Sequence, residues 1–305
     1  MIEGRDFQKQ RKNYMKSKSL FYALILLVPT LLWSQKSESW ILTPGEAKAI
    51  LTGSLVLDTR SRSVFYREHI NGSRSVTWEE FSVSELPHKG NLLPLDVLKK
   101  KLEAYGIRND QPVLVISETK NNWGEDGRIV WMLRSLGHRN AFLVDGGYSA
   151  LKQLGASVSN QGEAQQAGSF KIQFDSNLNA TSSEIRSNLK NKRYVFLDTR
   201  EEREFKGETP YGEARGGHIP GAKHLYYKVL LNEDGILLPS EKISEKIKEL
   251  GISRDSIVVS YCTGGIRSAW VTAVLRNEGF NAKNYAGSMW EWSSGNEKEY
   301  PLTLK

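Results

Sequence analysis

The chain has 305 residues, which at roughly 150 residues per domain predicts two domains, each large enough to bury its own core. Its composition is 39% hydrophobic, 25% charged and 10% aromatic, which is ordinary for a globular protein. A disordered chain, a collagen-like fibre and a multi-span membrane protein are therefore excluded.

The formal net charge of +7 is concentrated near the amino terminus. Residues 1–33 contain six basic and two acidic side chains, a net charge of +4, so only +3 remains for the other 272 residues. A protein that follows a phosphate backbone needs a concentrated basic face. The nearly balanced body argues against binding of nucleic acid.

The first predicted element is a leader over residues 1–39. Its basic part precedes the 14-residue apolar run Leu20–Trp33, which contains a proline and is shorter than the roughly 20 residues needed to span a bilayer as a straight helix. The run lacks the polar face of a helix that packs on a core. We expect a signal sequence that exports the chain, to the periplasm, or an uncleaved anchor that tethers it to a membrane.

Strands and helices alternate through residues 40–155, the first predicted domain. Short apolar strands are predicted at 55–57, 113–117 and 141–144, and helices near 95–105 and 127–136. Residues 156–170 lack periodicity and are rich in Gly, Ser, Gln and Ala, so we expect a linker there.

The second predicted domain, residues 171–305, repeats this alternation. A helix begins after the cap signal at 181–184, strands are predicted at 194–197 and 257–261, and helices at 240–250 and 266–278. The spacing predicts an α/β fold for each domain, with a mainly parallel sheet flanked by helices on both faces.

Four segments recur in the same order in the two halves. VLDTR at 56–60 recurs as FLDTR at 196–200, 140 residues later, and Gly146 matches Gly287. LLP at 92–94 and GI at 106–107 both recur 145 residues later. The nearly constant offset indicates a duplicated domain.

Cys262 is the only cysteine, so a disulfide within the chain and a thiolate zinc site are both excluded. It follows the predicted strand 257–261, and a loop then leads into a helix; the loop residues are Thr263, Gly264, Gly265, Ile266, Arg267 and Ser268. A strand, a glycine loop and a helix start direct backbone N–H groups at whatever the loop encloses. That field favours thiolate over thiol, so Cys262 is the candidate catalytic residue and 263–268 the candidate substrate-binding loop.

The spacing from Cys262 to Arg267 is C-x4-R. Cysteine phosphatases use C-x5-R, which would require an arginine where this chain has Ser268. A loop one residue shorter suits a single terminal sulfur carried on the cysteine better than a tetrahedral phosphate.

Four ordered motifs carry a resemblance to a known family: LDTR at 197–200, GHIPGA at 217–222, CTGGIRS at 262–268 and YAGSMWEW at 285–292. In these motifs the second half resembles the catalytic domain of a rhodanese, and residues 40–305 resemble the tandem-domain sulfurtransferases that use thiosulfate or 3-mercaptopyruvate. The amino-terminal domain of that family is usually a non-catalytic copy. Strand alignment places Glu118 opposite Cys262, and a carboxylate cannot carry a transferable sulfur, so we expect the first domain to be inactive.

The resemblance implies a two-step exchange, for which no cofactor or metal is expected. Cys262 takes the outer sulfur of a small anionic donor as a persulfide, and a nucleophilic acceptor such as cyanide, a thiol or a thioredoxin-like protein then removes it. Loop amides stabilise the charge, and Arg267 either receives the donor or pairs with a neighbouring acid. The loop leaves thiosulfate and 3-mercaptopyruvate open as donors, and the long insert at 206–215 favours thiosulfate.

Asp198, Arg200 and His218 are held back from catalysis. They have counterparts, Asp58, Arg60 and His69, in the domain that lacks a thiol. A catalytic group would not need a twin in an inactive copy, so we predict structural support.

Three other arginines, Arg62, Arg128 and Arg203, could face a cleft between the domains and recruit an anionic donor, but solvated surface positions are expected for them. Two other functions also stay open. One is a non-enzymatic sulfur carrier or sensor that keeps the persulfide for a client protein, and the other is a cysteine phosphatase or arsenate reductase.

Overall fold

The structure, a computed structural model, describes residues 39–304 except 119, 121 and 163–165. The predicted leader therefore lies outside the described residues, apart from Ser39. Across the described ranges, no helix is both long and apolar enough to cross a membrane.

The first repeat, in the described part of the chain, is built on a five-stranded parallel sheet in the order β1-β6-β5-β2-β4. Its strands are β1 (Ile41–Leu42), β2 (Leu55–Asp58), β4 (Arg74–Ser75), β5 (Val113–Ile116) and β6 (Ala141–Val144). Its helices are α2 (Pro44–Ile50), α3 (Arg62–Phe65), α4 (Leu95–Ala104), α5 (Glu125–Ser135) and α6 (Gly147–Gln153), with 3-10 turns at Leu51–Gly53 and Trp78–Phe81.

The second repeat has a sheet of the same kind, parallel throughout, in the order β10-β9-β11-β12-β8. Its strands are β8 (Asn179–Ala180), β9 (Tyr194–Asp198), β10 (Lys223–His224), β11 (Ile257–Tyr261) and β12 (Asn281–Tyr285). Its helices are α7 (Ser182–Asn188), α8 (Glu202–Phe205), α9 (Ser240–Glu249), α10 (Ile266–Asn277) and α11 (Ser288–Ser294), with 3-10 turns at Ser176–Leu178 and Tyr227–Leu230. The predicted α/β class, with helices on both faces of two mainly parallel sheets, is confirmed.

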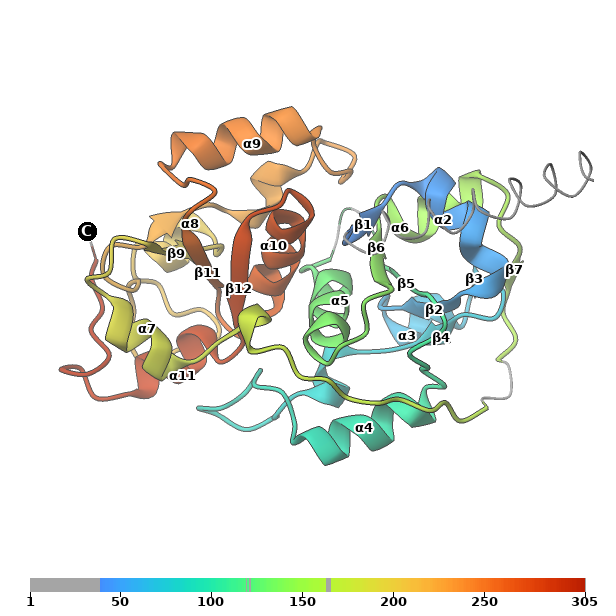
Figure 1. Ribbon diagram of the computed structural model, residues 1–305, viewed down its shortest axis with the longest axis horizontal. Coiled ribbons are helices and arrows are strands. Elements are labelled where there is room, and N and C mark those ends of the chain that lie inside the picture. Colours follow the sequence, from blue (N-terminus) through green and yellow to red (C-terminus); the bar gives the residue numbers. More distant parts are fainter. Residues whose placement is uncertain (1–38, 119, 121, 163–165, 305) are drawn as a thin grey trace, which may run out of the picture. The chain divides into compact units, whose positions relative to one another are not determined.

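Alternate residues of each central strand enter different cores, because successive side chains of a strand point to opposite faces. In β11, Val258 packs with α9 and α10, whereas Val259 packs on the other face with Ile185 of α7 and Met289 of α11. Figure 1 shows α9 and α10 on one side of this sheet and α7 and α11 on the other. A strand buried on both faces reads as a continuous apolar run, and β11 follows this pattern except at Ser260.

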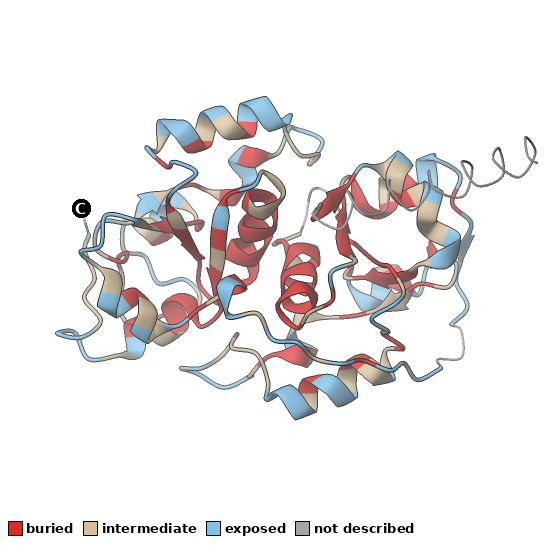
Figure 2. Ribbon diagram, viewed as in Figure 1, coloured by how far each residue is buried: buried red, intermediate tan, exposed pale blue. Residues whose placement is uncertain are grey.

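The two repeats share one apolar core, because α5 of the first packs against α10 of the second. Gly127 makes this approach possible, since a Cβ there would overlap the backbone and side chain of Trp270. Both helices are buried over nearly their whole length, whereas α9 buries only Ile243 and Ile247 (Figure 2). Residues 40–305 accordingly form one compact unit.

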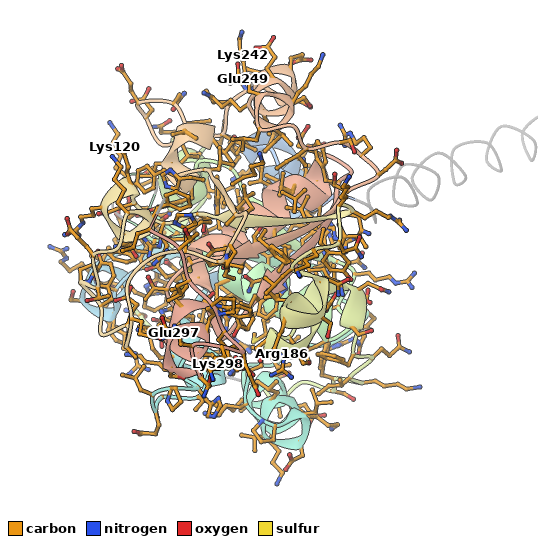
Figure 3. The ribbon with its side chains drawn as sticks, turned by 90° about the vertical axis from the view of Figure 1, so that its left-hand side faces the viewer. Lys120, Arg186, Lys242, Glu249, Glu297 and Lys298 are labelled. Atoms are coloured by element: carbon orange, nitrogen blue, oxygen red, sulfur yellow. The ribbon has the colours of Figure 1, made fainter. Side chains whose placement is uncertain are left out.

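The segment 156–170, predicted as a linker, is partly structured. Within it, β7 (Val158–Ser159) pairs antiparallel with β3 (His69–Ile70), and Phe170 is buried beside His138. A two-residue strand has no periodicity, which is why the sequence does not reveal it. Outside the cores, charges of both signs project from the surface, as Lys242 and Glu249 do on α9 (Figure 3).

Candidate active site at the end of strand β11

Cys262 is the first residue after β11, and its loop turns directly into α10. The backbone N–H of Gly265 donates a hydrogen bond to Sγ at 3.1 Å, and the Ser268 hydroxyl lies 3.6 Å from the same sulfur. Burial alone would raise the pKa of the thiol. The charge of Arg267 and hydrogen bonds from Ser268 and Gly264 outweigh burial, so the pKa of Cys262 lies below its ordinary value.

The two loop glycines are required by close contacts rather than by general flexibility. Gly265 has φ +82°, a left-handed conformation that favours glycine, and a Cβ on it would press on the Ala286 carbonyl. A Cβ on Gly264 would overlap the ring of Trp290. The loop can therefore curl around the sulfur only with glycine at both positions.

Arg267 pairs with a buried acid, which is one of the two roles expected for it. Its guanidinium donates to both carboxylate oxygens of Glu204, at 2.6 and 2.8 Å, and to the Thr263 hydroxyl at 2.7 Å. Burial opposes ionisation of Glu204, but the paired guanidinium outweighs it and lowers the pKa of this carboxyl. Arg267 therefore keeps its positive charge beside the sulfur, while its two Nη atoms already donate hydrogen bonds to Glu204 and Thr263.

A cavity of about 170 Å³ opens beside the sulfur. Its lining is mostly aromatic and comes from both repeats: Trp78, Trp123, Glu125, Tyr211, Cys262, Thr263, Gly264, Ile266, Arg267 and Trp290. Cys262 itself is only 1% exposed, whereas Trp123 at the cavity is 41% exposed. The thiol is therefore reached through this cavity and not from the open surface.

The first repeat lacks a thiol, but its counterpart of Cys262 is not Glu118, as the strand alignment predicted. Asp198 of β9 pairs with Tyr261 and Asp58 of β2 pairs with Ile116, so the residue that follows Ile116, Ser117, corresponds to Cys262. The alignment failed because β11 begins one residue earlier than β5, which shifts a count made from the strand starts by one. Ser117 is buried and cannot form a thiolate.

The charges around the thiol are also missing from the first repeat. Gly124 and Gly265, with φ +83° and +82°, precede α5 and α10 in the same way, so Asp126 takes the place of Arg267. Val64 takes the place of Glu204 on the corresponding short helix. Sequence reasoning missed Glu204, and this difference between the copies is the signal that could have found it.

Asp198 and Arg200 form a buried pair beside the sheet. Arg200 donates from Nε and Nη2 to the Asp198 carboxylate, at 2.9 and 2.6 Å, and from Nη2 to the Gly217 carbonyl at 2.8 Å. Asp58 and Arg60 make the same pair in the first repeat, with the shortest contact at 2.7 Å. The arrangement does not depend on the presence of a thiol.

His218 also has the same surroundings in both copies. Its ring stacks on Phe205 and its Nδ1 lies 2.9 Å from the Phe205 carbonyl oxygen. His69 stacks on Phe65 and makes the corresponding contact at 2.8 Å. Neither ring lines the cavity beside Cys262.

The surface expectation for the three remaining arginines is wrong for Arg128. Arg62 and Arg203 are exposed and form ion pairs with Glu80 and Glu201. Arg128 is buried and donates a hydrogen bond to the Gly265 carbonyl of the Cys262 loop at 3.2 Å. The contact between α5 and α10, which the sequence does not reveal, places it there.

Comparison with known proteins agrees with this arrangement. The family model of the Rhodanese-like domain matches residues 43–154 and 181–295. The sulfur carrier protein TtuD of Thermus thermophilus is 27% identical, and the match covers 74% of this chain and 82% of that protein. The thiosulfate sulfurtransferase of Azotobacter vinelandii is 25% identical, with 87% of this chain and 97% of that protein covered. A probable 3-mercaptopyruvate sulfurtransferase of Pseudomonas aeruginosa is 31% identical, with 64% of this chain and 69% of that protein covered.

Among solved structures, the 3-mercaptopyruvate sulfurtransferase from Leishmania major has the same fold. The TM-score is 0.73 at 24% identity, and the match covers 84% of this chain and 75% of that one. At this identity the likeness concerns the fold alone.

Proposed function

Because the chain belongs to the Rhodanese-like domain family, we propose that it is a sulfurtransferase that carries sulfane sulfur as a persulfide on Cys262. The observation that carries the proposal is the Gly265 N–H directed at Sγ, 3.1 Å away, in a loop that also lowers the pKa of the thiol. A cysteine that only fills space needs neither feature.

In the first step the Cys262 thiolate attacks the outer sulfur of the donor. With thiosulfate, a new S–S bond forms to Cys262, the S–S bond of the donor breaks, and sulfite leaves with the electron pair. In the second step cyanide attacks the terminal sulfur, the persulfide bond breaks, and thiocyanate leaves while Cys262 regains its thiolate. In both the thiolate and the persulfide form the negative charge stays on sulfur beside the same loop. The same N–H and O–H groups of the loop therefore stabilise the charge in both steps.

We propose thiosulfate as the donor and a small nucleophile, cyanide or a thiol, as the acceptor. The cavity of about 170 Å³ has the volume of about six water molecules, at roughly 30 Å³ each, and so admits a small ion. The relative from Azotobacter vinelandii is named for thiosulfate, and that from Pseudomonas aeruginosa for 3-mercaptopyruvate. The competing donor is therefore 3-mercaptopyruvate, and a thioredoxin-like protein is a further acceptor to test.

The test is formation of thiocyanate from cyanide, with thiosulfate or 3-mercaptopyruvate as donor. We expect turnover with the unchanged chain, a mass increase of one sulfur on Cys262 before cyanide is added, and neither in Cys262→Ser. The matched control is Ser117→Ala, which removes the corresponding hydroxyl of the first repeat and should leave turnover unchanged. Activity that survives in Cys262→Ser would refute the mechanism.

A non-enzymatic sulfur carrier that keeps the persulfide on Cys262 is the second candidate. One relative is itself named a sulfur carrier protein. A carrier would gain the mass of one sulfur on Cys262. After cyanide is added, it would form thiocyanate no faster than an uncatalysed persulfide does. Hydrolysis of p-nitrophenyl phosphate, tested beside these assays, would instead indicate a phosphatase.

We further propose that residues 1–39 export the chain, since a basic segment precedes their apolar run. Fusing these residues to a reporter whose disulfides form only after export tests this. Reporter activity equal to that of a fusion lacking residues 1–39 would refute it.

A further inference from the structure

Arg128 links the thiol-less repeat to the catalytic loop. It lies on α5, is 1% exposed, and reaches across to the second repeat, where its Nη1 donates to the Gly265 carbonyl at 3.2 Å. Its Nη2 donates to the Ser82 hydroxyl at 3.1 Å and to the Gly90 carbonyl. The guanidinium therefore sits directly behind the loop that holds Cys262.

No carboxylate of the described residues contacts this guanidinium, whose other neighbour is the ring of Trp131, 4.6 Å from it. Three other deeply buried arginines differ in this respect, because Arg60, Arg200 and Arg267 each pair with a carboxylate at 2.6 to 2.7 Å. A buried charge without a counter-charge is costly. Neutral dipoles lower this cost only in part, so an anion nearby would stabilise Arg128 further.

The nearby anion is the ionised sulfur of Cys262. Gly265 touches both groups, since its carbonyl accepts from Arg128 and its N–H donates to Sγ. One residue of backbone thus separates the guanidinium from the sulfur. The thiolate and the persulfide both place a negative charge at this point.

We propose that Arg128 is a positioning residue of the catalytic loop whose counter-charge is the anionic sulfur on Cys262, so that the first repeat stabilises the thiolate and the persulfide of the second. Arg128 does not touch the sulfur and acts through the loop and through its charge. Only the persulfide half of this inference rests on the proposed function, because the thiolate exists without a donor.

The other charged groups around the sulfur set the size of the effect. Of the cations around the sulfur, Arg267 acts most strongly on the thiol. Glu204 and Glu213 approach the Thr263 hydroxyl, and Glu125 lines the cavity. Burial lowers the pKa of Arg128 to about 9, which leaves it protonated at neutral pH, and the negative charge of Cys262 opposes that fall.

The test measures the pKa of Cys262 in the full-length, sulfur-free protein from the pH dependence of its alkylation by iodoacetamide. The chain has a single cysteine, so the signal has one source. We expect Arg128→Met to slow alkylation by about ten- to a hundredfold below the thiol pKa, the scale of one charge acting over several ångströms at an effective dielectric constant of about 20. Arg128→Lys, which keeps the charge, should stay close to the unchanged protein.

The matched control is Arg134→Met on the same helix. Arg134 is also buried, donates to the Ala141 carbonyl at 2.9 Å, and packs over the rings of Trp40 and Phe142. This variant should lower stability like Arg128→Met and leave the alkylation profile unchanged.

An unchanged alkylation profile in Arg128→Met would overturn the proposal and leave Arg128 a packing residue. If Arg128→Met does not fold, the test rests on Arg128→Lys, which keeps the positive charge. An alkylation profile of Arg128→Lys that is displaced as far as expected for loss of the charge would refute the electrostatic role. Absence of thiocyanate formation with a normal thiolate profile would instead count against the proposed function only.

Discussion

Replacing Glu204 with glutamine tests how the charges beside the sulfur are balanced. Glu204 is fully buried, and four donors face its two oxygens. Oε1 accepts from Arg267 and from the Thr263 hydroxyl, both at 2.8 Å, and Oε2 accepts from Arg267 at 2.6 Å and from the Glu201 N–H at 3.0 Å. Glutamine offers one oxygen and one NH₂ group, and the Thr263 hydroxyl can turn to accept from that NH₂ group, so one or two of the four donors would face another donor.

The cost follows from these contacts. Each hydrogen bond to a charged group contributes about 1.5–3 kcal/mol, so loss of one or two costs about 1.5–6 kcal/mol. Removal of one partner from a buried ion pair independently gives about 3–5 kcal/mol. We expect Glu204→Gln to lower the free energy of unfolding by about 3–5 kcal/mol in urea titrations, a large part of the roughly 5–15 kcal/mol of an ordinary domain.

The expected change in the pKa of Cys262 has the opposite sign to the change expected if the substitution only disrupted the loop. Without Glu204, Arg267 loses its paired carboxylate and one negative charge leaves the surroundings of the sulfur, so the pKa of Cys262 should fall further. The free energy of unfolding of Glu204→Gln should also depend less on pH than that of the unchanged protein. The lowered pKa of Glu204 gives stability that is fully present above its unfolded value of 4.5 and is lost as the pH falls through the folded value, and glutamine cannot titrate.

The control is Glu202→Gln on the same helix α8, where the carboxylate pairs with Lys206 in solvent. Its removal should leave both stability and the alkylation profile unchanged, because exposed pairs contribute little. A loss of stability below about 1 kcal/mol in Glu204→Gln, or a rise in the pKa of Cys262, would refute the charge balance described for this site.

Two further predictions concern the loop and the first repeat. Gly264→Ala should lower thiocyanate formation by about 100-fold, the scale of a misplacement of about 1 Å, because its Cβ would displace the Trp290 ring. Gly45→Ala, which meets open space, should leave turnover unchanged, and equal losses in the two variants would contradict this reasoning. Ser117→Cys in the Cys262→Ser background should gain no sulfur mass from thiosulfate, since Asp126 stands in place of the arginine; a persulfide on the introduced thiol would show that position alone suffices.

The sequence predicts the sheets and the loop because both depend on local patterns. Strands such as Val113–Ile116 are continuous apolar runs, and several helices begin or end at glycines. The Cys262 loop is also recognisable, since a single thiol between a strand and a helix carries its own signal. The two-residue strands at the sheet edges carry no such pattern, and neither does β12, which is mostly polar in sequence, so the sequence does not predict them.

The rest of the site depends on contacts between distant segments. Trp78, Trp123 and Glu125 belong to the first repeat, and no pattern in the sequence indicates that they line a cavity with Cys262. The burial of Arg128 follows from the packing of α5 on α10, which a helix pattern alone does not specify. The error at Ser117 has a local origin, because one extra residue at the start of β11 displaces the alignment.

The duplicated domain also explains how the site can be both buried and charged. The first repeat has no thiol, so its equivalent loop does not have to enclose a sulfur. The loop between Ser117 and Gly124 is four residues longer than its counterpart between Cys262 and Gly265. The added length includes Trp123, which lies over Arg267 at 5.0 Å and covers the cavity. Residues of both repeats surround the sulfur, so Cys262 is only 1% exposed and the charge interactions at the sulfur are stronger than they would be in water.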